Sequence, residues 1–224
     1  MALVPAPSNA DAPPCLDVWF EFASTYSYPA LVRIGPLAQA AGVRLRFRPF
    51  LLGPIFKAQG WDTSPFNIYP AKGRYMWRDL ERVCADLGLP LRRPPAFPAK
   101  SVLAARVALV GLGADGAGDR GWGEAFCVAV FRAALGEGRA IDDPDVITAL
   151  LSQLGVDATA VLAEAAGPAA KARLRDETAE AQRLGLFGAP SFVTADGELF
   201  WGNDRLEQAL AWAPKTCSPC HRRA

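Results

Sequence analysis

Apolar residues fall at every second position over residues 16–22. This period of two is typical of a β-strand. From Tyr28 to Leu37 the apolar residues recur at steps of three, which is the spacing of one helix face. The pattern therefore predicts a strand, then a tight turn that carries Ser24 and Ser27, and then a helix.

The start of a helix offers unpaired backbone N–H groups and the positive end of the helix dipole, so hydroxyl groups in this turn lie beside a place that favours negative charge. A serine in that position is most often a helix cap, and the pattern alone leaves this alternative open. The pair Gly35–Pro36 should kink or interrupt the helix, because proline removes a donor and clashes with the preceding turn.

Residues 44–50 alternate again and predict a second strand whose arginines face outward. Residues 51–74 have no clear period and are rich in proline, glycine and aromatic residues, which predicts a structured loop. Its aromatic side chains, with Lys57 and Lys72, suit a pocket for a ligand that is partly apolar and partly anionic. The alternative is a loop that packs its own side chains together.

Helical spacing begins at Tyr75 and ends at Gly88, which suits the position after a helix. Further segments with the same spacing are bounded by glycines or start with prolines. They predict helices over 100–112, 122–135, 144–154, 158–166 and 168–184.

Strand signals return near the C-terminus, over 191–194 and 199–201, on either side of an Asp196–Gly197 turn. A last helix starts near Asn203 or Asp204. We expect a disordered N-terminal arm over 1–15 and a disordered C-terminal tail over 214–224. Between them, a core unit is built from two separated segments, 16–50 and 186–213, and a helical insertion over 51–185 joins these segments.

The 224 residues are 51% hydrophobic and carry a formal net charge of +1, which gives no indication of a nucleic-acid partner or an anionic membrane surface. No apolar run approaches the roughly 18 residues that a membrane span needs. Residues 1–14 lack both the basic leader and the apolar core of a signal peptide. We therefore expect a cytoplasmic protein.

The five cysteines are odd in number and scattered, so they do not describe a disulfide framework. Cys84 and Cys127 lie in helical apolar patterns and should be core residues. The single histidine, His221, lies near the end of the chain, so the folded body has no Ser–His–Asp or Cys–His pair and no histidine-based metal site. We predict no metal.

Two further sequence motifs give little evidence of a functional site. Gly111, Gly113 and Gly116 spell G-x-G-x-x-G, but an alanine-rich helix precedes them where a dinucleotide site needs a strand. The C-terminal C-x-x-C of Cys217 and Cys220 has the spacing of a redox or metal motif, and the alternative, which we expect, is a disordered tail.

The order strand–helix–strand, helical block, strand–strand–helix resembles a thioredoxin fold with a large all-helical insertion. Periplasmic disulfide oxidoreductases and kappa-class glutathione transferases have this architecture, which implies an α/β fold here. Where those oxidoreductases carry C-x-x-C, this chain has Ser24 and Ser27 in an S-x-x-S motif. Without the two sulfurs, thiol–disulfide exchange at this position is chemically impossible.

Several stretches resemble the 2-hydroxychromene-2-carboxylate isomerases, which are glutathione-dependent relatives of the kappa class. EFASTYSYPA is similar to that family's D-F-x-S-P-x-S-Y, FGAPSF to V-F-G-V-P-T-F, and FWGNDRLEQAL to W-W-G-N-D-R-L. GPIFKAQG and SPFNIYPAKGRYMWRD resemble its pocket loop and the helix that follows. The resemblance covers about residues 16–213, with Thr25 in place of the common proline.

The resemblance implies a role for each matching residue. Ser24 faces the glutathione sulfur, whereas Ser27 should point back into the backbone. The backbone of Ala189, before a cis Pro190, pairs with the cysteinyl part of glutathione. The other implied glutathione-binding positions are two for the γ-glutamyl end and two polar positions of the pocket loop: Asn203, Asp204, Lys57 and Asn67.

The implied function is a glutathione-dependent cis–trans isomerase of aromatic catabolism, in which the glutathione thiolate adds reversibly to the substrate. The family also suggests a homodimer. Two alternatives stay open: a kappa-like glutathione transferase or peroxidase, and a thioredoxin-fold binding protein without catalytic activity.

Overall fold

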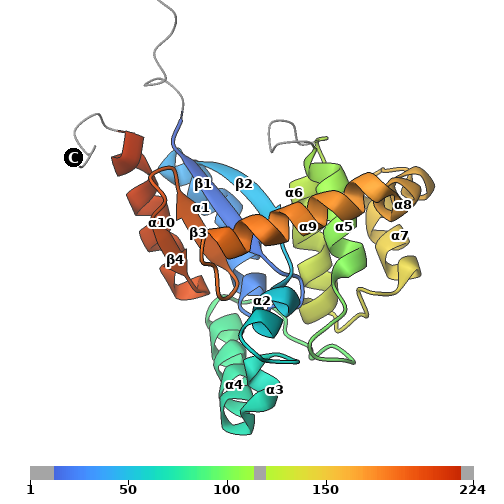
Figure 1. Cartoon of the computed structure of the whole chain (residues 1–224), viewed down its shortest axis with the longest axis horizontal. Helices are drawn as coiled ribbons and strands as arrows, with labels where there is room; N and C mark the ends of the chain where they lie inside the picture. Colours follow the sequence, from blue (N-terminus) through green and yellow to red (C-terminus); the bar gives the residue numbers. More distant parts are fainter. Residues whose placement is uncertain (1–12, 114–119, 218–224) are drawn as a thin grey trace, which may run out of the picture.

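The computed structural model describes residues 13–113 and 120–217, and it is built around one sheet of four strands in the order β2-β1-β3-β4 (Figure 1). β1 pairs in parallel with β2 and antiparallel with β3, and β3 pairs antiparallel with β4. The strand bounds are Cys15–Phe20, Arg44–Pro49, Ser191–Thr194 and Leu199–Trp201.

Both faces of β1 are buried. Leu16, Val18 and Phe20 enter the main core, to which α1 (Ser27–Ala41) and α10 (Leu206–Trp212) contribute. Trp19 enters a second, smaller core on the opposite face, where α9 (Pro168–Arg183) packs. Figure 1 shows α9 crossing in front of the sheet. This mixed sheet with helices on both faces confirms the predicted thioredoxin-like α/β fold.

The helical insertion contains the predicted helices nearly where the spacing placed them. These helices pack against one another, and α5, which also contacts β2, is buried almost all round. The helices are α5 (Val102–Leu112), α6 (Gly123–Phe131), which continues into a π-helical turn over Arg132–Gly136, α7 (Pro144–Gln153) and α8 (Ala158–Ala166). Cys84 and Cys127 are buried in the core, as predicted.

Gly111, the first glycine of the G-x-G-x-x-G sequence, has a packing role. A Cβ atom at Gly111 would lie 2.8 Å from the Cα of Gly123, so its absence lets α5 and α6 cross closely. Gly116 lies outside the described residues. Helix packing therefore explains Gly111, and Gly113 follows the end of α5 with a positive φ of 71°.

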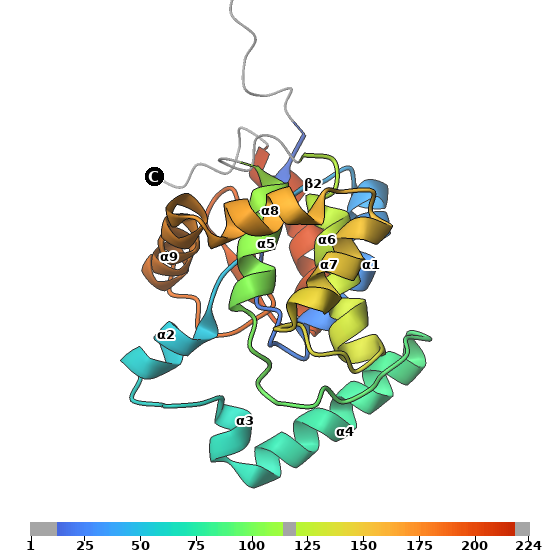
Figure 2. The same cartoon turned by 90° about the vertical axis from the view of Figure 1, so that its right-hand side faces the viewer.

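The prediction of a loop over 51–74 is wrong. The segment contains α2 (Leu52–Ala58), α3 (Pro65–Ile68) and the start of α4 (Pro70–Asp86). Pro65 and Pro70 open helices at the first turn, where a missing N–H costs nothing, so these prolines start helices instead of preventing them. Both views place α2, α3 and α4 at the lower side of the molecule (Figures 1 and 2).

The predicted interruption of the first helix is also wrong, because α1 runs without a break through Pro36. Ile34 and Ala38, on either side of the proline, are buried in the core, and this packing holds the helix together.

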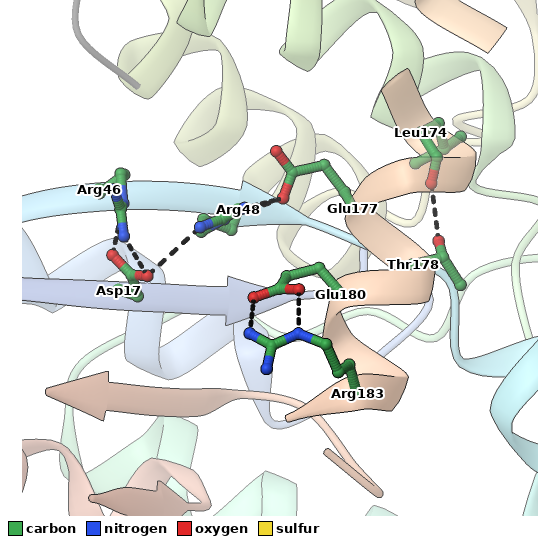
Figure 3. A network of polar contacts seen from close by, with 8 residues as sticks. All are labelled: Asp17, Arg46, Arg48, Leu174, Glu177, Thr178, Glu180 and Arg183. Carbon is green, nitrogen blue, oxygen red and sulfur yellow. Dashed lines mark hydrogen bonds and ion pairs between the residues drawn. The ribbon is translucent and has the colours of Figure 1, made fainter. Parts of the chain in front are cut away.

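Charged side chains connect β1 and β2 with α9 (Figure 3). Asp17 accepts hydrogen bonds from Arg46 at 2.5 Å and from Arg48 at 3.4 Å, and Arg48 donates to Glu177 of α9 at 2.8 Å. The hydrogen bond with Asp17 raises the pKa of Arg46. Thr178, one residue further along α9, accepts the N–H of Leu51 at 3.2 Å. These contacts fix where the chain leaves β2 and enters α2.

The chain ends outside the described residues. A short 3-10 helix over Ala213–Cys217 follows α10, and the rest of the C-terminal C-x-x-C motif, with His221, is not described. The expected N-terminal arm likewise falls almost entirely on residues 1–12, which are not described. None of the helices in the described ranges combines the length and the apolar character that a bilayer crossing requires.

Candidate active site

A cavity of about 670 Å³ opens where the turn after β1 meets α2, α3 and α4, and its volume lies in the usual range for small-molecule sites. Segments that are far apart in the sequence line it, including 97–99, 187–189 and 201–202. Its lining is rich in aromatic side chains: Tyr26, Phe56, Trp61, Phe66, Tyr75, Phe97, Phe187 and Trp201. Such a surface suits a flat apolar ligand.

Ser24 lies at the wall of this cavity. Its N–H donates to the carbonyl of Glu21 at 2.9 Å, which closes the turn after β1. Its Oγ donates to the carbonyl of Ala189 at 2.7 Å, across 165 positions of sequence. α1 begins at Ser27, so Ser24 lies just ahead of the helix and not in its first turn. Ser24 is partly exposed, and it precedes the N-terminus of α1, where the helix dipole is positive.

The Ala189–Pro190 peptide bond is cis, as predicted. Pro190 accepts the N–H of Gly202 at 2.9 Å, and both Ala189 and Gly202 line the cavity. The bend before β3 therefore brings the backbone of Ala189 to the hydroxyl of Ser24.

Ser27 does not make the backbone contact that we expected. Its side chain is fully buried, and its Oγ has no hydrogen-bond partner among the described residues. The first residue of α1 packs on the core, so the hydroxyl points into the interior instead of toward a backbone acceptor.

The other predicted site residues lie near the cavity but not in its lining, as far as the described residues show. Lys57 is exposed on α2. Asn67 donates to Thr63 Oγ1 and to the carbonyl of Phe97, each at 3.2 Å, so it supports the wall from behind. Their roles in binding remain predictions.

Asn203 and Asp204 form a 3-10 turn with Arg205 directly after Gly202. Arg33 of α1 donates to the side-chain oxygen of Asn203 at 3.1 Å and to its carbonyl at 2.9 Å. Asp204 forms an ion pair with Arg205 at 3.1 Å. Both residues are therefore engaged in protein contacts, and a role in binding glutathione remains a prediction.

Lys72, in the first turn of α4, is the one cationic side chain among the described residues that line the cavity. The sequence pointed to two pocket lysines, and only Lys72 lies in the lining. The start of α4 at Pro70 distinguishes the two lysines, because it places Lys72 in the first turn of a helix at the cavity. The loop prediction missed this helix start. Lys72 and the neighbouring Tyr75 are both exposed at the edge of the cavity.

Glu21 also lines the cavity, and it is only 6% exposed. Its carboxyl group accepts hydrogen bonds from the hydroxyl of Ser101 and from the N–H of Leu52. Burial raises the pKa of Glu21, and the two hydrogen bonds offset only part of this rise. The strand pattern gave no sign that this residue would be buried.

Tyr26 connects the Ser24 turn with α4, because its hydroxyl donates to Asp79 at 2.9 Å. Burial raises the pKa of Tyr26, and the hydrogen bond to Asp79 raises it further. Asp79 also accepts a hydrogen bond from Arg82 at 2.9 Å. The phenol is therefore a neutral donor that holds α4 beside the cavity.

Phe187 and Trp201 form an edge-to-face pair at the rim, with ring centroids 4.8 Å apart. They are 46% and 51% exposed. A Cβ atom at Gly188 would lie 2.3 Å from Nε1 of Trp201, so only glycine lets the indole lie against this bend. Exposed aromatic rings at the edge of a cavity are typical of a binding surface.

The arrangement places a hydroxyl donor, a helix start and an exposed lysine around an aromatic cavity. A hydroxyl group and a helix N-terminus both stabilise an anion, so the wall at Ser24 suits a bound thiolate or oxyanion. The sequence has one histidine, His221, and it lies outside the described residues. Among those residues, Ser24 has no histidine to activate it as a nucleophile, and its hydroxyl donates a hydrogen bond.

Comparison with known proteins gives consistent similarities. Residues 15–211 match the family described as the DSBA-like thioredoxin domain. The chain is 32% identical over 194 residues to 2-hydroxychromene-2-carboxylate isomerase of Sphingobium xenophagum, covering 86% of this chain and 94% of that protein. It is 26% identical over 205 residues to human glutathione S-transferase kappa 1, covering 87% and 88%.

Among solved structures, one of 2-hydroxychromene-2-carboxylate isomerase superposes with a TM-score of 0.79 at 28% identity. The superposition covers 91% of this chain and 96% of the other. The likeness therefore extends over the sheet, the helical insertion and the segments that line the cavity.

Proposed function

The chain belongs to the DSBA-like thioredoxin domain family and to the 2-hydroxychromene-2-carboxylate isomerase family, and on that premise we propose that it is a glutathione-dependent isomerase of aromatic catabolism. Family membership makes the protein an isomerase. The proposed substrate is a 2-hydroxychromene-2-carboxylate or a benzo-fused analogue, whose hemiketal ring opens and whose carbon–carbon double bond changes geometry.

The observation that carries the proposal is the meeting of Ser24 and Ala189 at the wall of an aromatic cavity. Glutathione fits this wall, because the Ser24 hydroxyl suits a sulfur anion and the Ala189 carbonyl suits a peptide N–H. Lys72, at the cavity edge, suits a carboxylate. When bound, glutathione supplies a thiolate that adds reversibly to the conjugated chain, so that the former double bond rotates before the sulfur leaves.

Ser24 provides the anion stabilisation that this chemistry needs. A free thiol has a pKa of about 8.5, so only a few per cent is ionised at pH 7. A hydroxyl bond to an anion contributes about 1.5–3 kcal/mol and a helix N-terminus about 0.3–1 kcal/mol. Together these lower the thiol pKa by roughly 1.5–3 units, so most bound thiol would be thiolate without a protein base.

The aromatic walls hold the second ligand. Phe56, Phe66 and Phe97 contribute ring surface inside the cavity, and Phe187 with Trp201 contributes it at the rim. Burial of a flat ring system against such surfaces is favourable and excludes water from the reacting atoms. The remaining predicted contacts to glutathione, at Lys57, Asn67, Asn203 and Asp204, are part of this proposal, as is a homodimer.

A second candidate function is a kappa-like glutathione transferase or peroxidase. The similarity to glutathione S-transferase kappa 1 favours it, since that protein matches over most of both chains. The two functions differ in the product. The isomerase releases a rearranged substrate and regenerates glutathione, whereas the transferase releases a thioether conjugate.

The test is turnover of 2-hydroxychromene-2-carboxylate with and without glutathione, followed by absorbance and by chromatography of the product. A free isomer formed only with glutathione supports the proposal, and a conjugate supports the transferase. If titration calorimetry detects no glutathione binding at millimolar concentration, the protein is instead a binding protein without this activity.

A further inference from the structure

Glu21 occupies a position where one residue touches three parts of the cavity wall. Its carbonyl closes the Ser24 turn, and its side chain accepts hydrogen bonds from Leu52 and Ser101. We propose that Glu21 is a positioning residue, whose buried carboxyl group fixes the α2 wall and the Phe97–Ala99 wall relative to Ser24 and thereby sets how tightly the aromatic substrate binds. The substrate part of this inference rests on the proposed function.

The first connection is to α2. Leu51 precedes this helix and provides no side-chain cap, so the first N–H groups need partners from elsewhere. The N–H of Leu52 donates to the carboxyl group of Glu21, and the N–H of Leu51 donates to the hydroxyl of Thr178. The position of α2 therefore depends on a side chain from β1's end, some thirty positions earlier in the sequence.

The second connection is to the segment before α5. Ser101 stands at the N-cap position of α5, yet its side chain does not cap that helix. Its hydroxyl donates instead to Glu21, at 2.5 Å, and Ser101 is itself buried. Two residues earlier, Ala99 ends the stretch Phe97–Ala99 that lines the cavity. The contact between Ser101 and Glu21 therefore anchors this wall.

The burial of Glu21 gives these connections their importance. An ionised carboxyl group is costly to bury, and no cation pairs with Glu21 among the described residues. Its two side-chain hydrogen bonds are what make its burial tolerable, so they are kept in one geometry. A buried group with fixed partners from two elements aligns those elements as one unit.

The two walls that Glu21 aligns are on the aromatic side of the cavity, where they contribute Phe56 and Phe97. The Ala189 side is held by the hydrogen bonds from the Ser24 hydroxyl to Ala189 and from the Gly202 N–H to Pro190, and it does not involve the Glu21 side chain. Loss of the carboxyl group should therefore raise KM for the aromatic substrate, while kcat and glutathione affinity change little.

Three variants and a control test this inference. In Glu21→Gln the amide oxygen still accepts the N–H of Leu52, and the amide NH₂ group donates to Ser101, whose hydroxyl turns to accept. Glu21→Ala removes both bonds, and Ser101→Ala removes one. Glu198→Ala, at an exposed glutamate in the β3–β4 turn, is the matched control.

We expect KM to rise about tenfold in Glu21→Ala and about threefold in Ser101→Ala, with wild-type values in Glu21→Gln and Glu198→Ala. Rescue by glutamine separates positioning from acid–base chemistry, since glutamine cannot titrate. A rise of KM in Glu21→Gln as large as that in Glu21→Ala would overturn the inference, and so would a loss of kcat in both variants. An unchanged KM in both Glu21→Ala and Ser101→Ala would also overturn it.

Hydrogen exchange of the free protein provides a readout that needs neither ligand nor activity. In Glu21→Ala, or in Ser101→Ala if the former does not fold, amides over 51–58 and 97–104 should exchange faster, while those of β3 keep the wild-type rate. Equal exchange in all variants overturns the positioning role. If the wild type neither binds glutathione nor isomerises the substrate, the proposed function fails, while the exchange result still decides the role of Glu21.

Discussion

The two sides of the cavity are built in different ways. The side at Ser24 and Ala189 is formed by the turn after β1 and the bend before β3, where the Ser24 hydroxyl donates to the Ala189 carbonyl at 2.7 Å. The side at α2, α3 and α4 is made of side chains from helices that lie outside the central sheet, and several of these side chains are exposed. The first side is suited to chemistry that needs a fixed donor, and the second to choosing which ring system enters.

The comparison predicts that the largest effect on turnover comes from the sheet side. Ser24→Ala removes the hydroxyl donor to the sulfur anion, which contributes about 1.5–3 kcal/mol, so turnover should fall roughly ten- to a hundredfold. The thiolate absorbance of the bound cofactor should titrate at higher pH, and by the same linkage glutathione should bind more weakly at pH 7, by no more than the factor lost in turnover. Stopped-flow turnover and an ultraviolet pH titration measure both.

Ser27→Ala is the control for that experiment. Because the Ser27 hydroxyl is buried without a partner among the described residues, its removal should leave turnover and thermal stability near the wild-type values. An effect at Ser27 equal to that at Ser24 would mean that the wrong serine has been assigned to the sulfur.

The helical side should respond to the contact that holds α4. Tyr26→Phe deletes the hydrogen bond to Asp79, and a bond to a charged group contributes about 1.5–3 kcal/mol. Asp79 is partly exposed, so water replaces part of the lost hydrogen bond. We therefore expect KM for the aromatic substrate to rise up to about tenfold, with kcat nearly unchanged.

Asp79→Asn keeps an acceptor for the Tyr26 hydroxyl and should therefore have a smaller effect than Tyr26→Phe. Steady-state kinetics of both variants decide this. A fall in kcat without a change in KM would show that α4 serves the chemistry and would break the contrast between the two sides.

A smaller effect should separate the two lysines. Lys72 lines the cavity and Lys57 does not, as far as the described residues show. An exposed ion pair contributes about 0.2–1 kcal/mol, so Lys72→Ala should weaken binding of a carboxylate ligand at most about fivefold. Lys57→Ala should weaken binding less than Lys72→Ala does, because Lys57 lies outside the described lining. Titration calorimetry at low and high salt measures the difference, and the reverse ranking would show that Lys57 is the main carboxylate contact.

The smallest effect concerns pH and Glu21. Burial raises the pKa of Glu21 in the folded protein above its ordinary value of about 4.5, so the folded state binds this proton more tightly than the unfolded chain. The stability that this group contributes is therefore lost as pH rises from the unfolded pKa through the folded pKa. Glu21→Gln does not titrate.

The free energy of unfolding of the wild type should thus fall relative to that of Glu21→Gln as pH rises from 5 to 8, as urea denaturation at several pH values measures. If the free energy of unfolding of the wild type instead rises relative to that of Glu21→Gln, the two hydrogen bonds stabilise the carboxylate by more than burial destabilises it.

Sequence patterns were sufficient where an element is long and its period is clean. The spacing predicted the first strand, which ends at Phe20 instead of residue 22, and the helices between 100 and 184. α2 and α3 are too short for a period to show, and their prolines suggested a loop. The sequence therefore could not show that Lys72 lines the cavity and Lys57 does not, because this depends on where α4 begins.

The site was predictable where one motif carries it and not where distant segments meet. Ser24 and Ala189 lie in short motifs, so both could be named, together with the cis bond before Pro190. Glu21 falls on the polar side of an alternating strand, and nothing local indicates burial. Its environment is created by Ser101, eighty positions away. Such a contact exists only once the insertion has folded against the sheet.

The hydrogen bond between Ser24 and Ala189 makes the site selective for the ligand that it binds. In the free protein donor and acceptor satisfy each other, so a ligand must break this bond and replace both halves. On the proposed function, glutathione does so, because its thiolate accepts from Ser24 while its own peptide N–H donates to Ala189. A small thiol without a peptide group would leave the Ala189 carbonyl unpaired, so the site discriminates between thiols by what lies next to the sulfur.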